Sequence, residues 1–206
     1  MTTDLILAFA GYAFVTSITP GPNNAMLLAS GANFGFWRTL PHIAGINLGF
    51  GAMVLAVGLG AGAIFTIYPV LYLILKIVGA AYLAYLAWLI ATATSIEGSG
   101  QSGKPMTFLG AAAFQWVNPK AWIMVVGAIS TYLSPAGSWM QVALLTTIYV
   151  LVNLPCIIVW AGFGQIVRRL LTDRALVWFN RAMALLLVVS LYPVVFELTA
   201  MLQGRR

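Results

Sequence analysis

The sequence predicts an all-α integral membrane protein with six transmembrane helices, arranged as two inverted three-helix repeats. Of its 206 residues, 62% are hydrophobic and only 7% are charged, whereas about 25% are charged in a typical soluble domain. The mean hydropathy is +0.97. Because a helix needs about 20 apolar residues to cross a bilayer, this length allows about six crossings and leaves no room for a soluble domain.

Apolar runs long enough to span a membrane recur along the chain. A polar, glycine- and serine-rich segment, SIEGSGQSGKP at 95–105, is predicted to link a first repeat, 1–94, to a second, 106–206. The run 165–174 is predicted to be a basic loop. The predicted spans cover residues 5–33, 40–64, 70–92, 106–132, 139–164 and 177–201.

Two of these spans, the first and the fourth, are predicted to be broken. The first contains the run TPGPNN, which begins at Thr19, and the fourth contains Asn118-Pro119-Lys120. Proline removes a backbone donor and clashes with the preceding turn, and glycine loosens the backbone. A break at membrane depth frees N–H and C=O groups that protein, water or a ligand must satisfy. Each break therefore predicts a polar cavity.

An internal repeat relates the two breaks. A shift of 99 residues aligns Phe9 with Phe108, Gly11 with Gly110, Ala13 with Ala112, and Pro20 with Pro119. Since each half has three spans, an odd number, the second half must enter the membrane in the opposite sense. In inverted-repeat transporters, broken helices at matching positions mark the substrate site near the midplane.

The two breaks together form the candidate substrate site. If a helix resumes at Asn23, its first amides and its dipole suit a carboxylate, and Asn23 or Asn24 is predicted to cap it. Lys120 is predicted to pair with that carboxylate or to exchange a proton. Freed carbonyls at 16–19 and 115–117 are predicted to bind an amine, because the chain has only four acidic residues. The predicted substrate-binding residues are Pro20, Gly21, Pro22, Asn23, Asn24, Gln115, Asn118, Pro119 and Lys120.

Structural roles compete with these functional ones. The prolines can kink a helix without touching a ligand, and Lys120 can be a cation that snorkels from a helix end. Thr16 and Ser17 can bond carbonyls of their own helix as readily as a substrate. His42 is predicted to be interfacial rather than a proton carrier, and the single cysteine, Cys156, to be a small buried hydrophobe.

The charges predict an orientation rather than a nucleic-acid partner. The net charge is +6, but the cations are scattered near span ends, where they orient membrane proteins. The side with more cations is predicted to be cytoplasmic, which places both termini outside. That side carries Arg38, Lys104, Arg168, Arg169 and Arg174, and the other carries Arg205 and Arg206. Glycines four residues apart, as at Gly45 and Gly49, predict close helix contacts and allow a homodimer.

These motifs resemble those of the lysine-exporter (LysE-type) superfamily, and most closely its homoserine/threonine-resistance (RhtB-like) branch. The resemblance rests on TPGP from Thr19, GAAYL from Gly79 and Asn118-Pro119-Lys120, and it covers essentially the whole chain. It implies a bacterial inner-membrane exporter of amino acids or related small carboxylates, driven by proton antiport and without a cofactor. The chain departs from the pattern where relatives often carry acidic residues, at Phe50 and Asn153, which bears on proton coupling.

Other classes of function fit less well. An intramembrane enzyme needs a nucleophile with a base, paired aspartates or a metal set, and one histidine with one cysteine provides none of these. A non-transporting scaffold would explain glycine-rich helices but not two matching breaks. A passive small-solute channel remains open, because no acidic residue is predicted at mid-membrane.

Overall fold

The computed structural model describes residues 1–93, 104–134, 138–192, 194–196 and 199, and within these ranges it contains helices and no strands. Most of the predicted linker and the tail with Glu197, Arg205 and Arg206 lie outside the described residues. The helices are α1 (Thr3–Ile18), α2 (Pro22–Phe34), α3 (Phe36–Ala56), the π-helical η1 (Val57–Ala61), α4 (Ala63–Ile67), α5 (Pro69–Ala91), α6 (Phe108–Val117), α7 (Pro119–Tyr132), α8 (Trp139–Leu170) and α9 (Asp173–Val189).

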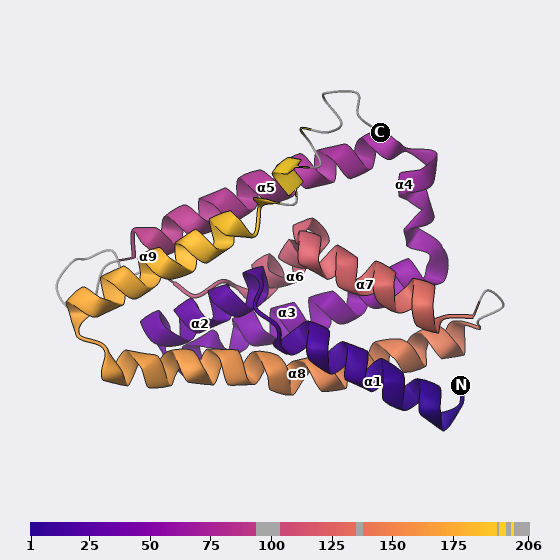
Figure 1. Cartoon of the computed structure of the whole chain (residues 1–206), viewed down its shortest axis with the longest axis horizontal. Coiled ribbons are helices and arrows are strands. Elements are labelled where there is room, and N and C mark those ends of the chain that lie inside the picture. The colour runs from indigo at the N-terminus through magenta and orange to yellow at the C-terminus, as the bar shows by residue number, and fades with distance from the viewer. Residues whose placement is uncertain (94–103, 135–137, 193, 197–198, 200–206) are drawn as a thin grey trace.

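The helices form an elongated bundle whose long axis is roughly that of α8 (Figure 1). Helices α5 and α9 pack against each other along one side, and α8 runs along the opposite side against α1, α2 and α3. The short helices α6 and α7 lie between these layers, with α6 packed on α3. The starts of α2 and α7 are thereby brought to the middle of the bundle.

Both proline motifs coincide with a change of helix. Helix α1 ends at Ile18 and α2 begins at Pro22, with an angle of 54° between them. Helix α6 ends at Val117 and α7 begins at Pro119. Proline alone does not cause this, since Pro41 and Pro155 lie inside unbroken helices. A proline is tolerated best in the first turn, where its missing N–H has no intrahelical partner.

Two predicted segments differ from the structure in their ends. The second span, predicted at roughly 40–64, corresponds to the candidate span Phe36–Ala61. Near its end α3 gives way to η1, where Gly60 has φ +103, and then to α4. A positive φ suits glycine and cannot continue a right-handed helix. The predicted basic loop 165–174 is largely helical, because α8 continues to Leu170. Arg168 and Arg169 lie in its last turn, where cations stabilise the negative end of the helix dipole.

Glycines allow the central helices to approach closely. A Cβ atom at Gly45 would collide with the carbonyl oxygen of Phe108, and one at Gly49 with the backbone of Ala112. The predicted contact through these two glycines is therefore confirmed, and the partner is α6. Where α2 crosses α8, a Cβ at Gly164 would collide with the carbonyl oxygen of Leu28.

Paired amides join the two halves of the chain inside the bundle. Asn33 and Asn180 exchange hydrogen bonds of 2.8 and 2.9 Å between α2 and α9. Asn153 of α8 donates to Asn47 of α3 at 2.8 Å. All four side chains are buried, and pairing removes most of the cost of burying an amide in an apolar interior.

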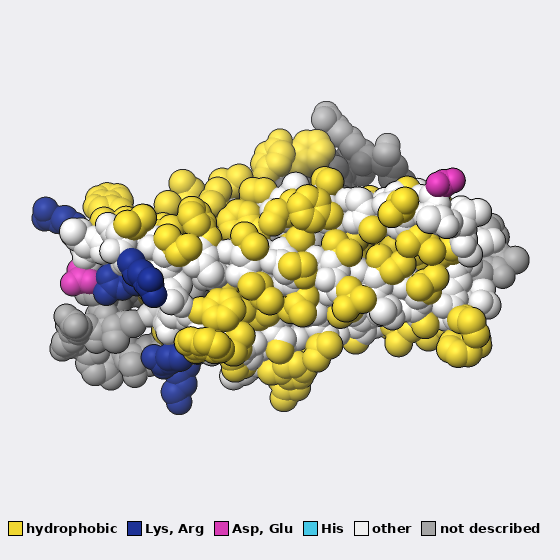
Figure 2. Space-filling model, turned by 90° about the horizontal axis from the view of Figure 1, so that it is seen from below, with side chains coloured by type: hydrophobic (Ala, Val, Ile, Leu, Met, Phe, Trp, Pro, Cys, Tyr) yellow, Lys and Arg dark blue, Asp and Glu magenta, His cyan; other side chains and the backbone are white. Residues whose placement is uncertain are grey.

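The outer surface suits a lipid environment. Four of the described helical segments are long and apolar enough to cross a membrane, or five if α1 and α2 form one bent span. Large apolar side chains are exposed on all the long helices, and Figure 2 shows them along most of the length of one face. Lys and Arg side chains gather at one end of that face, where α2 turns into α3 and α8 into α9. The molecule is a multi-pass membrane protein.

Candidate functional site

The end of α1 presents a row of carbonyl oxygens that have lost their helical partners, and side chains from three other helices bind them. Asn24 of α2 donates to Ser17 O at 2.9 Å and to Thr19 O at 2.8 Å. Trp160 of α8 donates its indole N–H to Ile18 O at 3.1 Å. The carbonyl oxygens freed at the end of α1 are thus satisfied within the protein, as a break in hydrocarbon requires.

Lys120 provides the cation at this break. It belongs to the first turn of α7, and its ammonium group lies 2.6 Å from Thr19 O, 3.0 Å from Thr19 Oγ1 and 3.2 Å from Pro20 O. Its side chain crosses Gly21, where a Cβ atom would lie 2.5 Å from Lys120 Cδ. Lys120 therefore reaches across to the first break. This position differs from that of a lysine that snorkels out of the bundle.

The positive end of α2 has no side-chain cap. Its N-cap residue is Gly21, and no side chain in the described ranges accepts from its first amides. The prediction that Asn23 or Asn24 caps this helix was wrong, because both amides have other partners. Asn23 and Gln115 of α6 exchange hydrogen bonds of 2.8 and 3.3 Å, and Asn24 binds the carbonyls at the end of α1.

The second break differs from the first. Asn118 accepts a hydrogen bond from the amide of Lys120 at 3.1 Å and so caps α7 with its own side chain. Of the carbonyls before this break, Trp116 O accepts from the indole N–H of Trp122 at 2.7 Å. Of the two helix starts, that of α2 therefore has the uncapped amides, which suit an anion.

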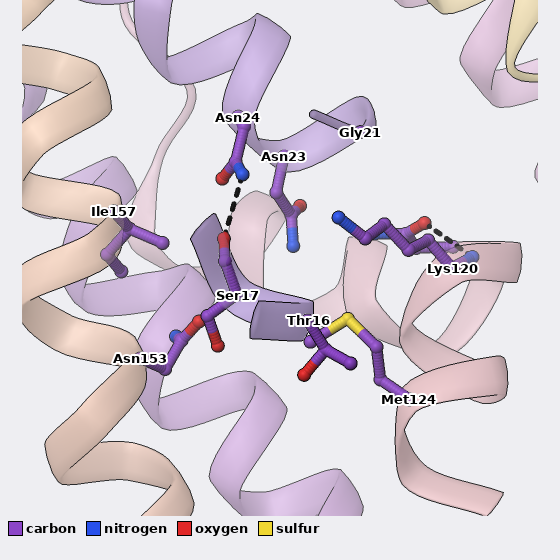
Figure 3. Close-up of a pocket in the computed structure, with 10 residues that line it drawn as sticks. Thr16, Ser17, Gly21, Asn23, Asn24, Lys120, Met124, Asn153 and Ile157 are labelled. Atoms are coloured by element: carbon purple, nitrogen blue, oxygen red, sulfur yellow. Dashed lines mark hydrogen bonds between the residues drawn. The ribbon is translucent and has the colours of Figure 1, made fainter. Parts of the chain in front are cut away.

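A pocket lies between the two breaks (Figure 3). Asn24 points toward Ser17, and Lys120 extends from α7 toward α2. The cavity volume is about 20 Å³, which is room for about one water molecule. The lining residues are Thr16, Ser17, Gly21, Asn23, Asn24, Asn118, Lys120, Met124, Asn153 and Ile157.

Five of the nine predicted site residues line this pocket: Gly21, Asn23, Asn24, Asn118 and Lys120. The other four lie beside it. Gln115 is buried behind Asn23, which it orients. Pro22 and Pro119 begin their helices, and Pro20 contributes its carbonyl oxygen.

Sequence reasoning did not place Met124, Asn153 or Ile157 in the site. Nothing distinguishes an apolar pocket residue such as Met124 from a core residue in a chain this hydrophobic. Asn153 did carry a signal, since a polar side chain in the middle of an apolar span marks an interior or functional position.

The two hydroxyls near the end of α1 differ in their partners. Thr16 Oγ1 donates a hydrogen bond to a carbonyl of its own helix, Tyr12 O, at 2.7 Å, as the structural alternative predicts. The same oxygen lies 2.8 Å from the Tyr149 hydroxyl. Ser17 is 3% exposed, and its hydroxyl has no hydrogen-bond partner in the described part of the chain. A buried hydroxyl without a partner is costly unless a water or ligand binds it.

Two other singled-out residues lie outside this pocket. His42 is 2% exposed within α3, because neighbouring helices enclose it; its position at the membrane interface stays a prediction. Cys156 is buried in α8, as predicted. Among the described residues, no group of three or more His, Cys, Asp or Glu side chains is placed to hold a metal ion.

Comparison with known proteins identifies the family. The family of LysE type translocators matches residues 14–191 of the chain. The chain belongs to this family. The match spans both breaks and every residue that lines the pocket.

Curated relatives of this translocator carry a more specific name. The cysteine/O-acetylserine efflux proteins of Escherichia coli (strain K12) and Shigella sonnei (strain Ss046) are each 35% identical to it over 191 residues, which is 91% of this chain and 96% of theirs. The protein of that name from Escherichia coli O139:H28 (strain E24377A / ETEC) is 34% identical over the same length. No solved structure matches significantly.

Proposed function

We propose that this translocator exports small amino acids with uncharged side chains across the bacterial inner membrane, and that the substrate binds between the two helix breaks. One observation carries the proposal. Carbonyl oxygens at Thr19 and Pro20 lie immediately before Gly21, and the uncapped start of α2 lies immediately after it. An α-amino acid carries an ammonium and a carboxylate on one carbon, so it needs such acceptors and donors side by side.

The substrate class follows from the lining of the pocket and from the relatives. Met124 and Ile157 provide apolar surface, and no acidic side chain lines the pocket to receive a cationic side chain. Relatives 35% identical to this chain are named for efflux of cysteine and O-acetylserine, two amino acids with short, uncharged side chains. Ser17, whose buried hydroxyl has no partner among the described residues, is the donor we assign to such a substrate.

Transport is proposed to follow an inverted-repeat plan with six crossings. In this plan, α1 with α2 corresponds to α6 with α7, α3 to α8, and α5 to α9, so the repeats are 1–94 and 106–206. Rocking of one repeat against the other would open the pocket to each side in turn. The end rich in Lys and Arg would face the cytoplasm.

Proton antiport is the proposed coupling. Lys120 is the one titratable side chain among the residues that line the pocket, so it is the group that would carry the exchanged proton. The lack of a carboxylate in that lining favours a second candidate, a passive path for the same substrates.

Efflux from proteoliposomes tests the proposal. Vesicles are preloaded with reduced cysteine or O-acetylserine, and efflux is followed with and without an imposed pH gradient, with protein-free vesicles as the control. Antiport predicts that the gradient accelerates efflux, and a passive path predicts equal efflux in both conditions. No efflux above that of protein-free vesicles would contradict transport and leave a scaffold role. Vesicles loaded with arginine should retain it.

A further inference from the structure

We infer that the ammonium group of Lys120 occupies the subsite for the substrate's own ammonium, so that substrate must displace this tethered cation in order to bind. The inference rests on the proposed function, because it assigns a subsite within that pocket. It concerns the empty protein and identifies the three oxygen atoms that form the subsite: Thr19 O, Thr19 Oγ1 and Pro20 O.

The geometry around Lys120 is that of an ammonium site. A primary ammonium has three N–H donors and no acceptor, and Lys120 Nζ has three oxygen neighbours at 2.6, 3.0 and 3.2 Å. Two of these are carbonyls just past the C-terminal end of α1, where the helix dipole is negative. These oxygens can therefore bind a cation without a carboxylate, which agrees with the lack of an acidic side chain in the lining.

The oxygens are accessible to a second ammonium. Thr19 and Pro20 are both exposed residues, and Lys120 is only partly buried. The lysine side chain also lies along the space beside Gly21, and the cavity volume left is only about 20 Å³, too small for an amino acid. Displacing Lys120 would vacate the subsite and enlarge the pocket at the same time.

The displaced lysine has a new partner within reach. It lies beside the uncapped start of α2, where the substrate carboxylate is proposed to bind. The substrate ammonium and the Lys120 ammonium thus exclude each other from the three oxygens, whereas the substrate carboxylate and the lysine attract each other. If Lys120 only joined α7 to α1 as a structural contact, it would make the same hydrogen bonds, but added amines would not compete with it.

Binding of ethylammonium chloride to the purified protein tests this inference without any transport step. Ethylammonium has the three donors but no carboxylate, and tetramethylammonium, a cation with no N–H donor, is the control at equal ionic strength. Lys120→Met removes the tethered ammonium. It should bind ethylammonium about tenfold or more tighter than the native protein, the equivalent of one hydrogen bond to a charged group.

A second variant keeps the lysine and moves it. Gly21 has φ −179, an extended conformation open to any residue, so Gly21→Ala should fold. Its methyl group would push the flexible lysine side chain off the oxygens. Gly21→Ala should also bind ethylammonium more tightly than the native protein. If Lys120→Met does not fold, the affinity of Gly21→Ala alone tests the inference.

Two results would overturn the inference: equal ethylammonium affinity in the native and variant proteins, or equal gains for ethylammonium and tetramethylammonium. Either result leaves the efflux experiment unaffected. Conversely, a protein that fails to export amino acids but shows the predicted ethylammonium gain would refute the proposed function and not the subsite.

Discussion

At the scale of single residues, the first break concentrates the polar chemistry. Lys120 and Asn24 satisfy carbonyls at the end of α1. Among the residues that the structure describes, no side chain caps the start of α2 and none bonds the Ser17 hydroxyl. Groups that hold the break together and groups left for a ligand therefore lie within a few residues of each other.

Replacing Lys120 with glutamine should weaken recognition of the substrate carboxylate. A hydrogen bond to a charged group contributes about 1.5–3 kcal/mol, so we expect kcat/KM for the amino acid, relative to that for its amide, to fall about tenfold or more. The native protein should prefer an amino acid to its amide, and Lys120→Gln should lose this preference. Equal transport of acid and amide by the native protein would contradict the role of Lys120 toward carboxylate.

Removing the Ser17 hydroxyl should weaken substrate binding without lowering the stability of the fold. Ser17→Ala deletes a buried hydroxyl for which the described part of the chain offers no partner, so the thermal midpoint should stay level or rise while KM for efflux increases. Ser30→Ala is the matched control, because Ser30 is also buried but lies 2.9 Å from Thr39 Oγ1. Its loss should cost about 1 kcal/mol of stability. An unchanged KM in Ser17→Ala would show that the hydroxyl does not bind substrate.

At the scale of helices, sequence context decides what a proline does. Pro41 and Pro155 lie within continuous helices, whereas the motif around Gly21 and the pair Asn118-Pro119 divide theirs. Two prolines around a glycine, or a side-chain cap before the proline, stabilise a new helix start instead of a kink.

Replacing Pro20 and Pro22 together with alanine should join α1 to α2. The joined helix would bond the carbonyls and amides that the break exposes, so export should be lost while membrane insertion remains. The measurement is efflux alongside the amount of protein in the membrane fraction. Pro41→Ala, at a proline within α3, is the control and should keep export. Normal efflux in the double variant would exclude this break as the substrate site.

The crossing of α2 on α8 should not accept a methyl group. Gly164→Ala would place its Cβ against the carbonyl oxygen of Leu28, and overpacking of this kind costs about 1–3 kcal/mol. Gly162→Ala, on the same helix, has nothing within 4 Å of the added Cβ and should be neutral or slightly stabilising. Thermal unfolding in detergent compares the two, and equal midpoints would contradict this close contact.

At the scale of the whole molecule, the basic end sets the expected orientation. Membrane-impermeant maleimide on intact cells, in a Cys156→Ser background, should label Ser138→Cys at the start of α8 from outside. Thr172→Cys, between α8 and α9, should react only after the cells are permeabilised. The reverse pattern would show that the basic end faces outward, against the charge rule.

Much of the architecture could be predicted from the sequence, because polar groups cost much free energy in a bilayer and each cost depends on only a few neighbouring residues. Apolar runs predicted the long helices, and the proline motifs predicted where α2 and α7 begin. The passage from α3 into η1 could not be predicted, since a glycine such as Gly60 is compatible with helix, π-turn or bend until its neighbours are in place. The extent of α8 was missed because basic residues occur in loops and in last helical turns alike.

The sequence by itself determined that this chain is a helical membrane protein, which residues disrupt its helices, and that few acids are available to a substrate. These properties follow from composition and backbone chemistry, which act within a few residues. Only the tertiary structure decided that Lys120 reaches the carbonyls of the first break, that Asn23 pairs with Gln115 instead of capping α2, and that Asn153 and Ser17 line the same pocket. Such pairings join residues roughly a hundred positions apart, and packing of the two halves selects them from many partners of equal local chemistry.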